Sequence, residues 1–195
     1  AHYQKTGIAF SQENLDECKR ADAVLFGAIG LPDVRYPDGT EIATHFDLRA
    51  AMDLYAGLRP IRSYPGLPRI LTDKRAARID LILIREQSEG LLQPRLRGTV
   101  EDDSIARETM TISRRGSRRI AEFAFHVAAR RARNRRRPGR VLCVDKANAL
   151  VSMAFFRKLF DEVAAAHPET QAAHAYVDAT AMNLVRSPWD FDVLL

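Results

Sequence analysis

The stretch VLCVDKANAL (residues 141–150) begins as an apolar run and ends in a carboxylate, Asp145, beside an ammonium group, Lys146. A short apolar run bounded by polar residues is typical of a buried strand in a parallel sheet. In such sheets ligands bind beyond the carboxyl ends of the strands, so a strand that ends in charge either reaches solvent or delivers a reagent to a cleft. The stretch therefore predicts a β-strand with Asp145 and Lys146 at its functional end.

Other apolar runs repeat this pattern along the chain. Buried strands are expected at DAVLFGAIG (22–30), IDLILIRE (79–86), AHAYVDA (173–179) and FDVLL (191–195). Apolar residues at helical spacing predict helices over 12–21, 45–58, 153–167 and 179–186, the first opened by Ser11, and another helix capped by Ser117. Residues 90–113 have few helical signals and are expected to form paired strands, an arm outside the core. Strands that alternate with helices predict an α/β fold.

Composition excludes several classes of protein. The 195 residues are 46% hydrophobic and 28% charged, which is ordinary for a globular protein, and no apolar stretch approaches the length of about 20 that spans a bilayer. No membrane partner is therefore expected. The two cysteines, Cys18 and Cys143, are predicted to be buried reduced thiols of a cytoplasmic protein rather than a disulfide pair.

Arginine accounts for most of the net charge of +5, and seven arginines stand in RRARNRRRPGR (130–140). Such a run suits either a nucleic-acid surface or a solvated helix end before a strand, where cations complement the helix dipole. No aromatic residue is interleaved for base stacking. The solvated helix end is therefore the favoured interpretation, with no nucleic acid among the partners.

Four fragments, in order, carry a resemblance to a known family. They are LYAGLRP (54–60), LIREQSEGL (83–91), VDKANAL (144–150) followed by FFRKLFDEV (155–163), and HAYVDATAMNLVRSPWDFDVLL (174–195). Together they resemble the metal-dependent, NAD-linked decarboxylating dehydrogenases of 2-hydroxy acids, the family of isopropylmalate, isocitrate, tartrate and D-malate dehydrogenases. The resemblance covers essentially the whole chain.

The resemblance implies an isopropylmalate-dehydrogenase-like two-domain fold. Residues 1–55 would be part of the nucleotide-binding domain, and residues 56–195 the substrate and dimerisation domain, with the arm over 90–113 clasping a second copy. It also implies a first strand and Gly-rich turn before residue 1, and two further metal aspartates after residue 195. The chain is accordingly expected to be incomplete at both ends.

The resemblance also assigns the reacting groups. Three arginines, Arg49, Arg59 and Arg85, correspond to those that grip the substrate carboxylates, and planar guanidinium groups suit that task. Lys146 corresponds to the base that takes the hydroxyl proton as hydride leaves for NAD. Asp178 corresponds to a ligand of Mg²⁺ or Mn²⁺, which polarises the oxygen and stabilises the enolate when CO₂ departs. In the family the last two reach into the partner subunit's active site, which implies a homodimer.

Contacts to the cofactor are implied at three positions. Ile29 and Gly30 lie in the loop after the expected strand 22–30, and Asn148 stands where the family places a residue close to cofactor and substrate. For Asn148 the alternative is a helix cap, since Asn is a common cap residue.

The chain departs from the family pattern at Leu92. The family has a tyrosine there that protonates the enolate, whereas EGLL leaves no ionisable group. Hydride transfer would survive this change because Lys146 and the metal carry that step. Water or another side chain would have to supply the proton, which predicts a slower or differently ordered second half-reaction.

A second departure concerns specificity. His45 stands four residues before Arg49, where isopropylmalate enzymes have an apolar residue. Histidine gains a hydrogen bond from a hydroxyl or carboxylate but little from an alkyl group, which favours a small polar substrate such as tartrate or malate. The alternative is that His45 only caps or packs the start of its helix.

Three functions follow from these residues. The first is NAD-dependent oxidation, with metal-assisted decarboxylation, of a 2-hydroxy diacid such as isopropylmalate, tartrate or malate. The second is a truncated or degenerate non-catalytic paralogue that acts through its dimer surface, which Leu92 favours. The third, an arginine-mediated nucleic-acid binder, has only the charge run in its support.

Overall fold

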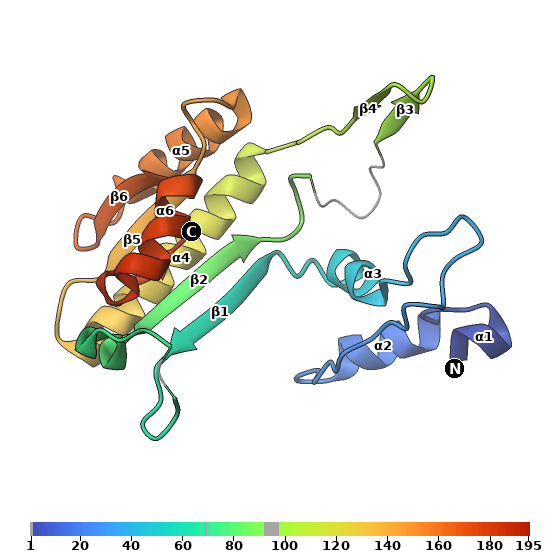
Figure 1. Cartoon of the computed structure of the whole chain (residues 1–195), viewed down its shortest axis with the longest axis horizontal. Helices are drawn as coiled ribbons and strands as arrows, with labels where there is room; N and C mark the ends of the chain where they lie inside the picture. Colours follow the sequence, from blue (N-terminus) through green and yellow to red (C-terminus); the bar gives the residue numbers. More distant parts are fainter. Residues whose placement is uncertain (1, 69, 92–97) are drawn as a thin grey trace. The chain divides into compact units, whose positions relative to one another are not determined.

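The structure, a computed structural model, describes residues 2–68, 70–91 and 98–195. These residues form two compact units, and the chain passes from the first to the second between Leu54 and Tyr55 (Figure 1). The second unit contains residues 55–91 and 98–195 within the described ranges. Each unit is treated separately below.

The first unit is built from helices and irregular chain. The helices are α1 (His2–Thr6), α2 (Gln12–Arg20) and α3 (Thr44–Ala51). The predicted start of α2 is confirmed, because the Ser11 hydroxyl accepts a hydrogen bond from the Asn14 amide at 3.2 Å. This cap satisfies one of the amide donors that the first helical turn leaves without a partner.

The strand predicted over 22–30 is absent from the structure. These residues are exposed and irregular, and the Leu25 side chain is fully exposed. An apolar run becomes a strand only where a neighbouring strand takes its backbone hydrogen bonds. The described part of the first unit offers no strand to pair with, since its β-pairing is limited to an isolated bridge between Arg35 and Glu41.

The second unit is organised around a five-stranded sheet of order β1-β2-β7-β5-β6. Strand β1 is antiparallel to β2, and the other neighbouring pairs are parallel. The strands are β1 (Ala56–Arg62), β2 (Asp80–Glu86), β5 (Arg140–Asp145), β6 (Gln171–Tyr176) and β7 (Val193–Leu194). The strand expected at FDVLL therefore occupies the centre of the sheet, and the α/β class is confirmed.

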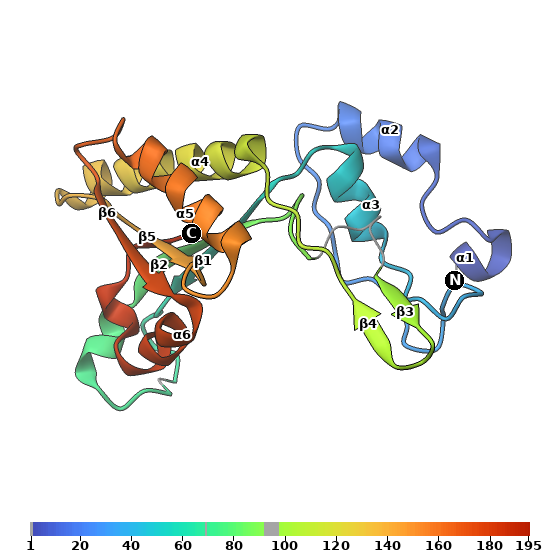
Figure 2. The ribbon, with the colours of Figure 1, turned by 90° about the horizontal axis from the view of Figure 1, so that it is seen from above.

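Helices cover the two faces of this sheet unequally. Figure 2 shows α4 (Arg114–Arg135) and α5 (Val151–Ala164) on one face and α6 (Val177–Arg186) on the other. The buried core lies under α4 and α5, where Phe125 and Phe160 pack with ring centroids 5.3 Å apart. Burying two such rings with their aliphatic neighbours stabilises this layer by several kcal/mol, at roughly 25 cal/mol per Å² of apolar surface. None of the helices in the described ranges combines the length and apolar character that a bilayer crossing requires.

The expected paired strands within residues 90–113 are confirmed as a hairpin. Strands β3 (Thr99–Glu101) and β4 (Ile105–Arg107) pair antiparallel. The connection uses Asp102 and Asp103, both with φ near +50°. Aspartate tolerates this left-handed region better than most residues, so the sequence suits the turn.

Two helix boundaries differ from the prediction. The helix expected over 45–58 ends at Ala51, because Asp53 adopts φ 48° and residues 56–62 join the sheet as β1. Helix α4 is capped by Ser113 rather than Ser117, which is buried inside the first helical turns. Two short 3₁₀ helices, η1 (Lys74–Arg78) and η2 (Pro188–Asp190), complete the unit.

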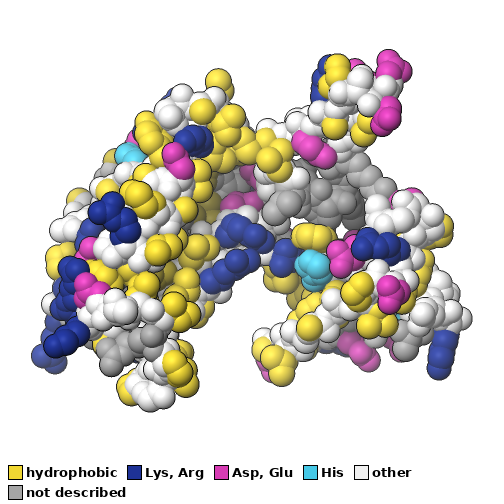
Figure 3. Space-filling model, in the orientation of Figure 1, with side chains coloured by type: hydrophobic (Ala, Val, Ile, Leu, Met, Phe, Trp, Pro, Cys, Tyr) yellow, Lys and Arg dark blue, Asp and Glu magenta, His cyan; other side chains and the backbone are white. Residues whose placement is uncertain are grey.

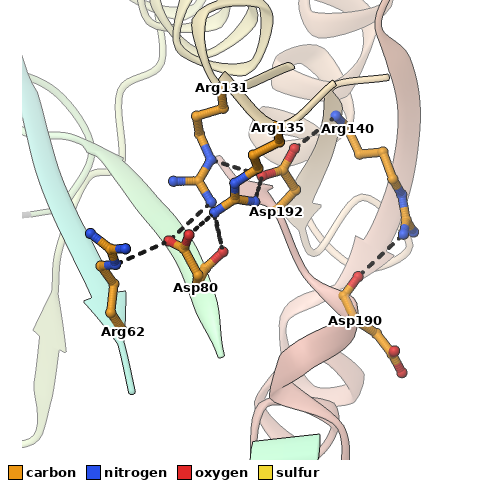
Figure 4. A network of polar contacts seen from close by, with 7 residues as sticks. All are labelled: Arg62, Asp80, Arg131, Arg135, Arg140, Asp190 and Asp192. Carbon is orange, nitrogen blue, oxygen red and sulfur yellow. Dashed lines mark hydrogen bonds and ion pairs between the residues drawn. The ribbon is translucent and has the colours of Figure 1, made fainter. Parts of the chain in front are cut away.

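A network of ion pairs joins α4 to the edge of the sheet where β2, β5 and β7 begin (Figure 4). Arg131 and Arg135 of α4 both contact Asp192, at 2.8 and 2.9 Å, and both contact Asp80. The side chains of Arg131 and Asp192 are 13% and 3% exposed. The prediction that a helix ends within residues 130–140 is thus correct. The prediction that its arginines are solvated is wrong for Arg131 and Arg135, which are largely buried in ion pairs.

Candidate active site

The candidate site lies at the opposite edge of the sheet, where the parallel strands end. Because β2, β7, β5 and β6 run in one direction, their last residues lie along the same edge. Arg85 is the penultimate residue of β2, Lys146 follows the end of β5, and Asp178 is the second residue of α6, directly after β6. Such an edge is where α/β sheets hold ligands.

Arg59 and Arg85 lie on neighbouring strands and share a face of the sheet. In the register of β1 and β2, Arg59 is opposite Leu83 and Gly57 is opposite Arg85, so the two arginines are diagonal neighbours. The Cβ atoms of diagonal neighbours are roughly 7–8 Å apart. Arg59 is exposed and Arg85 is half-buried. Two guanidinium groups at this spacing suit a ligand that carries carboxylates.

Gly57 lies against a side chain of the loop that follows β2. A Cβ atom at this position would lie 1.6 Å from Nε2 of Gln87, because the Gln87 side chain lies across the glycine. The backbone amide of Gln87 also donates a hydrogen bond to the Tyr55 carbonyl at 2.8 Å. The glycine of LYAGLRP therefore makes room for the residue that follows β2.

The loop that follows β2 is held by two carboxylates, one of which bonds to the cap of α4. Glu86 accepts hydrogen bonds from the backbone amides of Ser88 (2.8 Å) and Glu89 (2.7 Å). Glu89 accepts hydrogen bonds from the amide (2.7 Å) and hydroxyl of Ser113, the cap of α4. A carboxylate at a helix amino terminus also interacts favourably with the helix dipole. The loop after Arg85 is therefore held by the second unit's own core helix.

Lys146 and Asp178 form an ion pair at the ends of β5 and β6. Nζ of Lys146 lies 2.7 Å from Oδ1 of Asp178 and 5.7 Å from the centre of the Tyr176 ring. The hydrogen bond from Lys146, followed by those of the helix backbone, lowers the pKa of Asp178. The lysine is half-buried and the aspartate is exposed, so the pair stands at the surface of this single chain.

The turn that presents Lys146 is held through Arg157, a residue that the sequence did not single out. Asp145 is 1% exposed, and its carboxylate oxygens accept hydrogen bonds from Nε and NH2 of Arg157, both at 2.8 Å. Asp145 also accepts the Ala147 amide at 2.8 Å. Burial by itself would raise the pKa of Asp145, but the Arg157 and Ala147 hydrogen bonds lower it. A buried carboxylate requires a cationic partner, but the sequence does not identify which residue supplies it.

Asn148 lies exposed in the turn between β5 and α5. The cap of α5 is Leu150, without a side-chain hydrogen bond, so the alternative of Asn148 as that cap is wrong. Its expected contact with the cofactor stays a prediction. A cavity nearby is lined by the ends of three strands and by helix residues, among them Arg85, Val144, Phe156 and Leu195.

The remaining predicted residues lie in the first unit. His45 and Arg49 are on α3, where the His45 and Phe46 ring centroids are 4.2 Å apart and the Arg49 guanidinium lies 5.4 Å from the Phe46 ring centre. Burial and the charge of Arg49 lower the pKa of His45. The helix cap is Ala43 rather than His45, although His45 does pack at the helix start. Ile29 and Gly30 lie in exposed irregular chain.

The described residues thus place Arg85, Lys146 and Asp178 where the parallel strands of the second unit end, with Arg59 at the middle of β1. The residues His45, Arg49, Ile29 and Gly30 belong to the first unit. Leu92, the departure from the tyrosine of the family, lies outside the described residues. Across the described ranges, no three His, Cys, Asp or Glu side chains gather as a metal site would require. Asp178 has the oxygen chemistry that Mg²⁺ or Mn²⁺ prefers, but one carboxylate is too few for either ion.

Comparison with known proteins identifies the family of the chain. The whole chain, residues 1–195, matches the family model described as isocitrate/isopropylmalate dehydrogenase. The 3-isopropylmalate dehydrogenase of Shouchella clausii (strain KSM-K16) is 37% identical over 196 residues, covering 97% of this chain and 52% of that enzyme. That of Synechococcus sp. (strain CC9605) is 38% identical over 200 residues, covering 97% and 53%.

Solved structures agree with this match. The TT0538 protein of Thermus thermophilus superposes with a TM-score of 0.82 at 31% identity, covering 100% of this chain and 37% of that one. The isocitrate dehydrogenase of Methylococcus capsulatus gives 0.73 at 28% identity, covering 98% and 53%. The fold is therefore of the isocitrate and isopropylmalate dehydrogenase type. The chain belongs to the isocitrate/isopropylmalate dehydrogenase family. It spans about half the length of the curated relatives it matches.

Proposed function

We propose that the protein catalyses the NAD-dependent oxidation, with metal-assisted decarboxylation, of a small 2-hydroxy diacid such as isopropylmalate, tartrate or malate. The observation that carries the proposal is the Lys146–Asp178 ion pair, at the strand edge where β2 also ends with Arg85 as its penultimate residue. A cationic edge with a base beside it suits an anionic substrate that must lose a proton.

The family resemblance implies a role for each of these residues. Arg59 and Arg85 would grip a carboxylate of the substrate, and Arg49 of α3 would add a third guanidinium group. Lys146 would take the hydroxyl proton at Nζ in its uncharged form, and Asp178, 2.7 Å away, would stabilise the resulting ammonium ion. His45 would contact the variable substituent, which favours a polar one and hence tartrate or malate.

Two cofactors are part of the proposal, on the strength of the family. NAD would supply the hydride acceptor, near Asn148 and the exposed backbone of Gly30, whose φ of 98° favours glycine. The described residues of the first unit lack the strand, turn and helix that hold a pyrophosphate, so the fit to NAD is partial. Mg²⁺ or Mn²⁺ would take Asp178 as one ligand, and such ions need further oxygen ligands from water or from another part of the assembly.

We propose further that the protein is a homodimer whose active site is shared between subunits. Apolar side chains come to the surface of the second unit on the face of α6 and near its strand ends (Figure 3). The residues at least 44% exposed there are Leu150, Val151, Val177, Met182 and Val185. An exposed apolar surface of this kind marks interfaces between proteins. It lies beside Lys146 and Asp178, as a shared site requires.

The second candidate is a non-catalytic paralogue that acts through the same surface. The exposed apolar face of α6 favours it independently of any catalytic residue. Measuring activity distinguishes the two functions, because both predict a dimer but only the enzyme predicts turnover of a substrate.

The test is NADH production at neutral pH with Mn²⁺, using D-malate, L- and meso-tartrate, isopropylmalate and isocitrate, each with and without a chelator. The expected result is chelator-sensitive turnover of one substrate, lost in the variant Lys146→Met. Lys158→Met is the matched control, since this exposed lysine of α5 lies outside the site. A dimer without turnover on any substrate would reject catalysis and leave the paralogue. A monomer would reject the shared site.

A further inference from the structure

We propose that Arg157 is a positioning residue that holds both halves of the Lys146–Asp178 pair through one guanidinium group. The inference rests on the proposed function for its catalytic consequence, but the geometry stands on contacts within this chain. Arg157 touches neither Lys146 nor Asp178 in any described contact. It grips the residues that precede them, Asp145 at the end of β5 and Tyr176 at the end of β6.

On the β5 side, Arg157 fixes the direction in which the chain leaves the sheet. Both carboxylate oxygens of Asp145 are held at 2.8 Å, one by Nε and one by NH2 of the guanidinium group. The same carboxylate accepts the Ala147 amide, which bends the backbone around Lys146. Lys146 lies between Asp145 and Ala147, which are joined by this hydrogen bond. Rotation of the Asp145 carboxylate would therefore redirect the Lys146 side chain.

On the β6 side, the guanidinium lies over the ring of Tyr176, 5.3 Å from its centre. Tyr176 is the cap residue of α6, two positions before Asp178. Nζ of Lys146 lies 5.7 Å from the centre of the same ring. Asp145 and Tyr176 are also partners in the parallel register of β5 and β6. A single ring and a single carboxylate, both held by Arg157, therefore fix where the lysine and the aspartate meet.

The element that carries Arg157 is itself firmly placed. Helix α5 buries Leu159 and Phe160 completely, within one turn of Arg157. The Arg157 side chain is 27% exposed and its partner carboxylate is fully buried. Only arginine has a planar fork that bonds both oxygens of a carboxylate while stacking on an aromatic ring. Lysine at this position would keep the charge but lose the fixed plane.

The expected effect on catalysis follows from this loss of orientation. A shift of about 1 Å in a catalytic group lowers a rate by on the order of 100-fold. In Arg157→Lys we expect kcat to fall about 10- to 100-fold, with KM changed less than about 3-fold, because the substrate arginines lie on other elements. The smaller variant Arg157→Ala should recover activity when guanidinium ion is added at millimolar concentration, since the vacated position is open to solvent.

A second measurement needs no activity. In the whole protein without substrate, the labelling rate of Lys146 by an amine-reactive acetylating reagent is measured by mass spectrometry. Loss of the pairing with Asp178 leaves the amine more reactive, so both Arg157 variants are expected to label at least about 5-fold faster, by the loss of a charge-assisted hydrogen bond. In the control Lys158→Ala, whose substitution is on the same helix and exposed, Lys146 should be labelled at the wild-type rate.

The outcomes separate this inference from the proposed function. Unchanged labelling in Arg157→Lys, which keeps the charge and most of the side chain, would overturn the inference whatever the activity. Faster labelling in the Arg157 variants, when the wild-type protein turns over no substrate, would support the positioning role and reject the enzyme. A fall in kcat without recovery by guanidinium ion and without faster labelling would indicate a merely structural residue, and would also overturn the inference.

Discussion

Replacing Asp192 by asparagine should destabilise the second unit more than any surface substitution. The Asp192 carboxylate is 3% exposed and contacts Arg131 and Arg135, and the Arg140 amide donates to its second oxygen at 3.2 Å. Asparagine has nearly the same shape, so no cavity forms. What the substitution removes is the negative charge that faces two guanidinium groups of α4 at the base of the sheet (Figure 4).

The magnitude follows from what remains after the charge is lost. Removing one partner of a buried ion pair costs about 3–5 kcal/mol, because an uncompensated charge stays buried. Here Asp80 still faces both arginines, and its side chain is 34% exposed, which moderates the loss. We therefore expect about 3 kcal/mol, the lower end of that range. For a unit of this size that corresponds to a fall in Tm of about 6–12 °C.

The assay is equilibrium unfolding in urea, followed by the fluorescence of Trp189, the only tryptophan of the chain. Trp189 belongs to η2, three residues before Asp192, so its signal reports on this edge. The control is Glu101→Gln, which removes the exposed ion pair with Arg107 on the hairpin and should change the free energy of unfolding little. A loss below about 1 kcal/mol for Asp192→Asn would refute the assignment of a buried, compensated charge.

Three further predictions test other parts of the second unit. Ser113→Ala should lower the free energy of unfolding by about 1 kcal/mol, measured in urea, because the hydroxyl accepts the Gly116 amide at 3.0 Å as the cap of α4. Gly139→Ala should cost about 1–3 kcal/mol in the same assay, since the new Cβ would lie 2.7 Å from the backbone oxygen of Ala128; Gly27→Ala, with nothing within 4 Å, is its control. Burial would raise the pKa of Asp80, but Arg131 and Arg135 lower it overall, so its contribution to stability is complete above pH of about 4 and is lost as the pH falls further. Unfolding between pH 3 and 6 should accordingly be less pH-dependent in Asp80→Asn than in the wild type, and equal slopes would contradict the prediction.

Strands β2, β5, β6 and β7 of the second unit were predicted from the sequence, whereas β1 was not, because its first residues were assigned to the helix over 45–58. The failed strand prediction over 22–30 shows what such a pattern leaves out. Residues 79–86 and 22–30 carry the same signal, a short apolar run that ends in glycine or charge. The first became β2, with partners on both sides, while the second lies exposed and unpaired in the described structure. An apolar run indicates only that the side chains suit a strand. The neighbouring strand that takes its backbone hydrogen bonds comes from elsewhere in the fold, so no local sequence pattern predicts it.

In the candidate site, too, some residues could be predicted from local sequence motifs and others only from the fold. Lys146 and Asp178 were predicted as site residues from the motifs that contain them, and the structure places Nζ of Lys146 2.7 Å from Oδ1 of Asp178, while their catalytic roles stay a prediction. Arg157 was not, because its contact with Tyr176 depends on the parallel pairing of two strands that are separated by a whole helix. The motifs point to candidate reacting groups, whereas a residue that contacts the ends of two strands is found only when the strand register is known.

The arginine run shows how position within an element decides what a charge does. Arg131 and Arg135 are four residues apart on α4, so they project from one face of the helix and both reach the carboxylates at the base of the sheet. Arg130, Arg133 and Arg136 point elsewhere and are exposed. Composition alone would assign the whole run to a single basic surface. The helical period instead divides it into two arginines that pair with the buried Asp192 and the partly exposed Asp80, and a remainder that faces solvent. The run therefore contributes less free positive charge than its length suggests. The two arginines proposed to bind the substrate, Arg59 and Arg85, lie outside this run, on neighbouring strands β1 and β2.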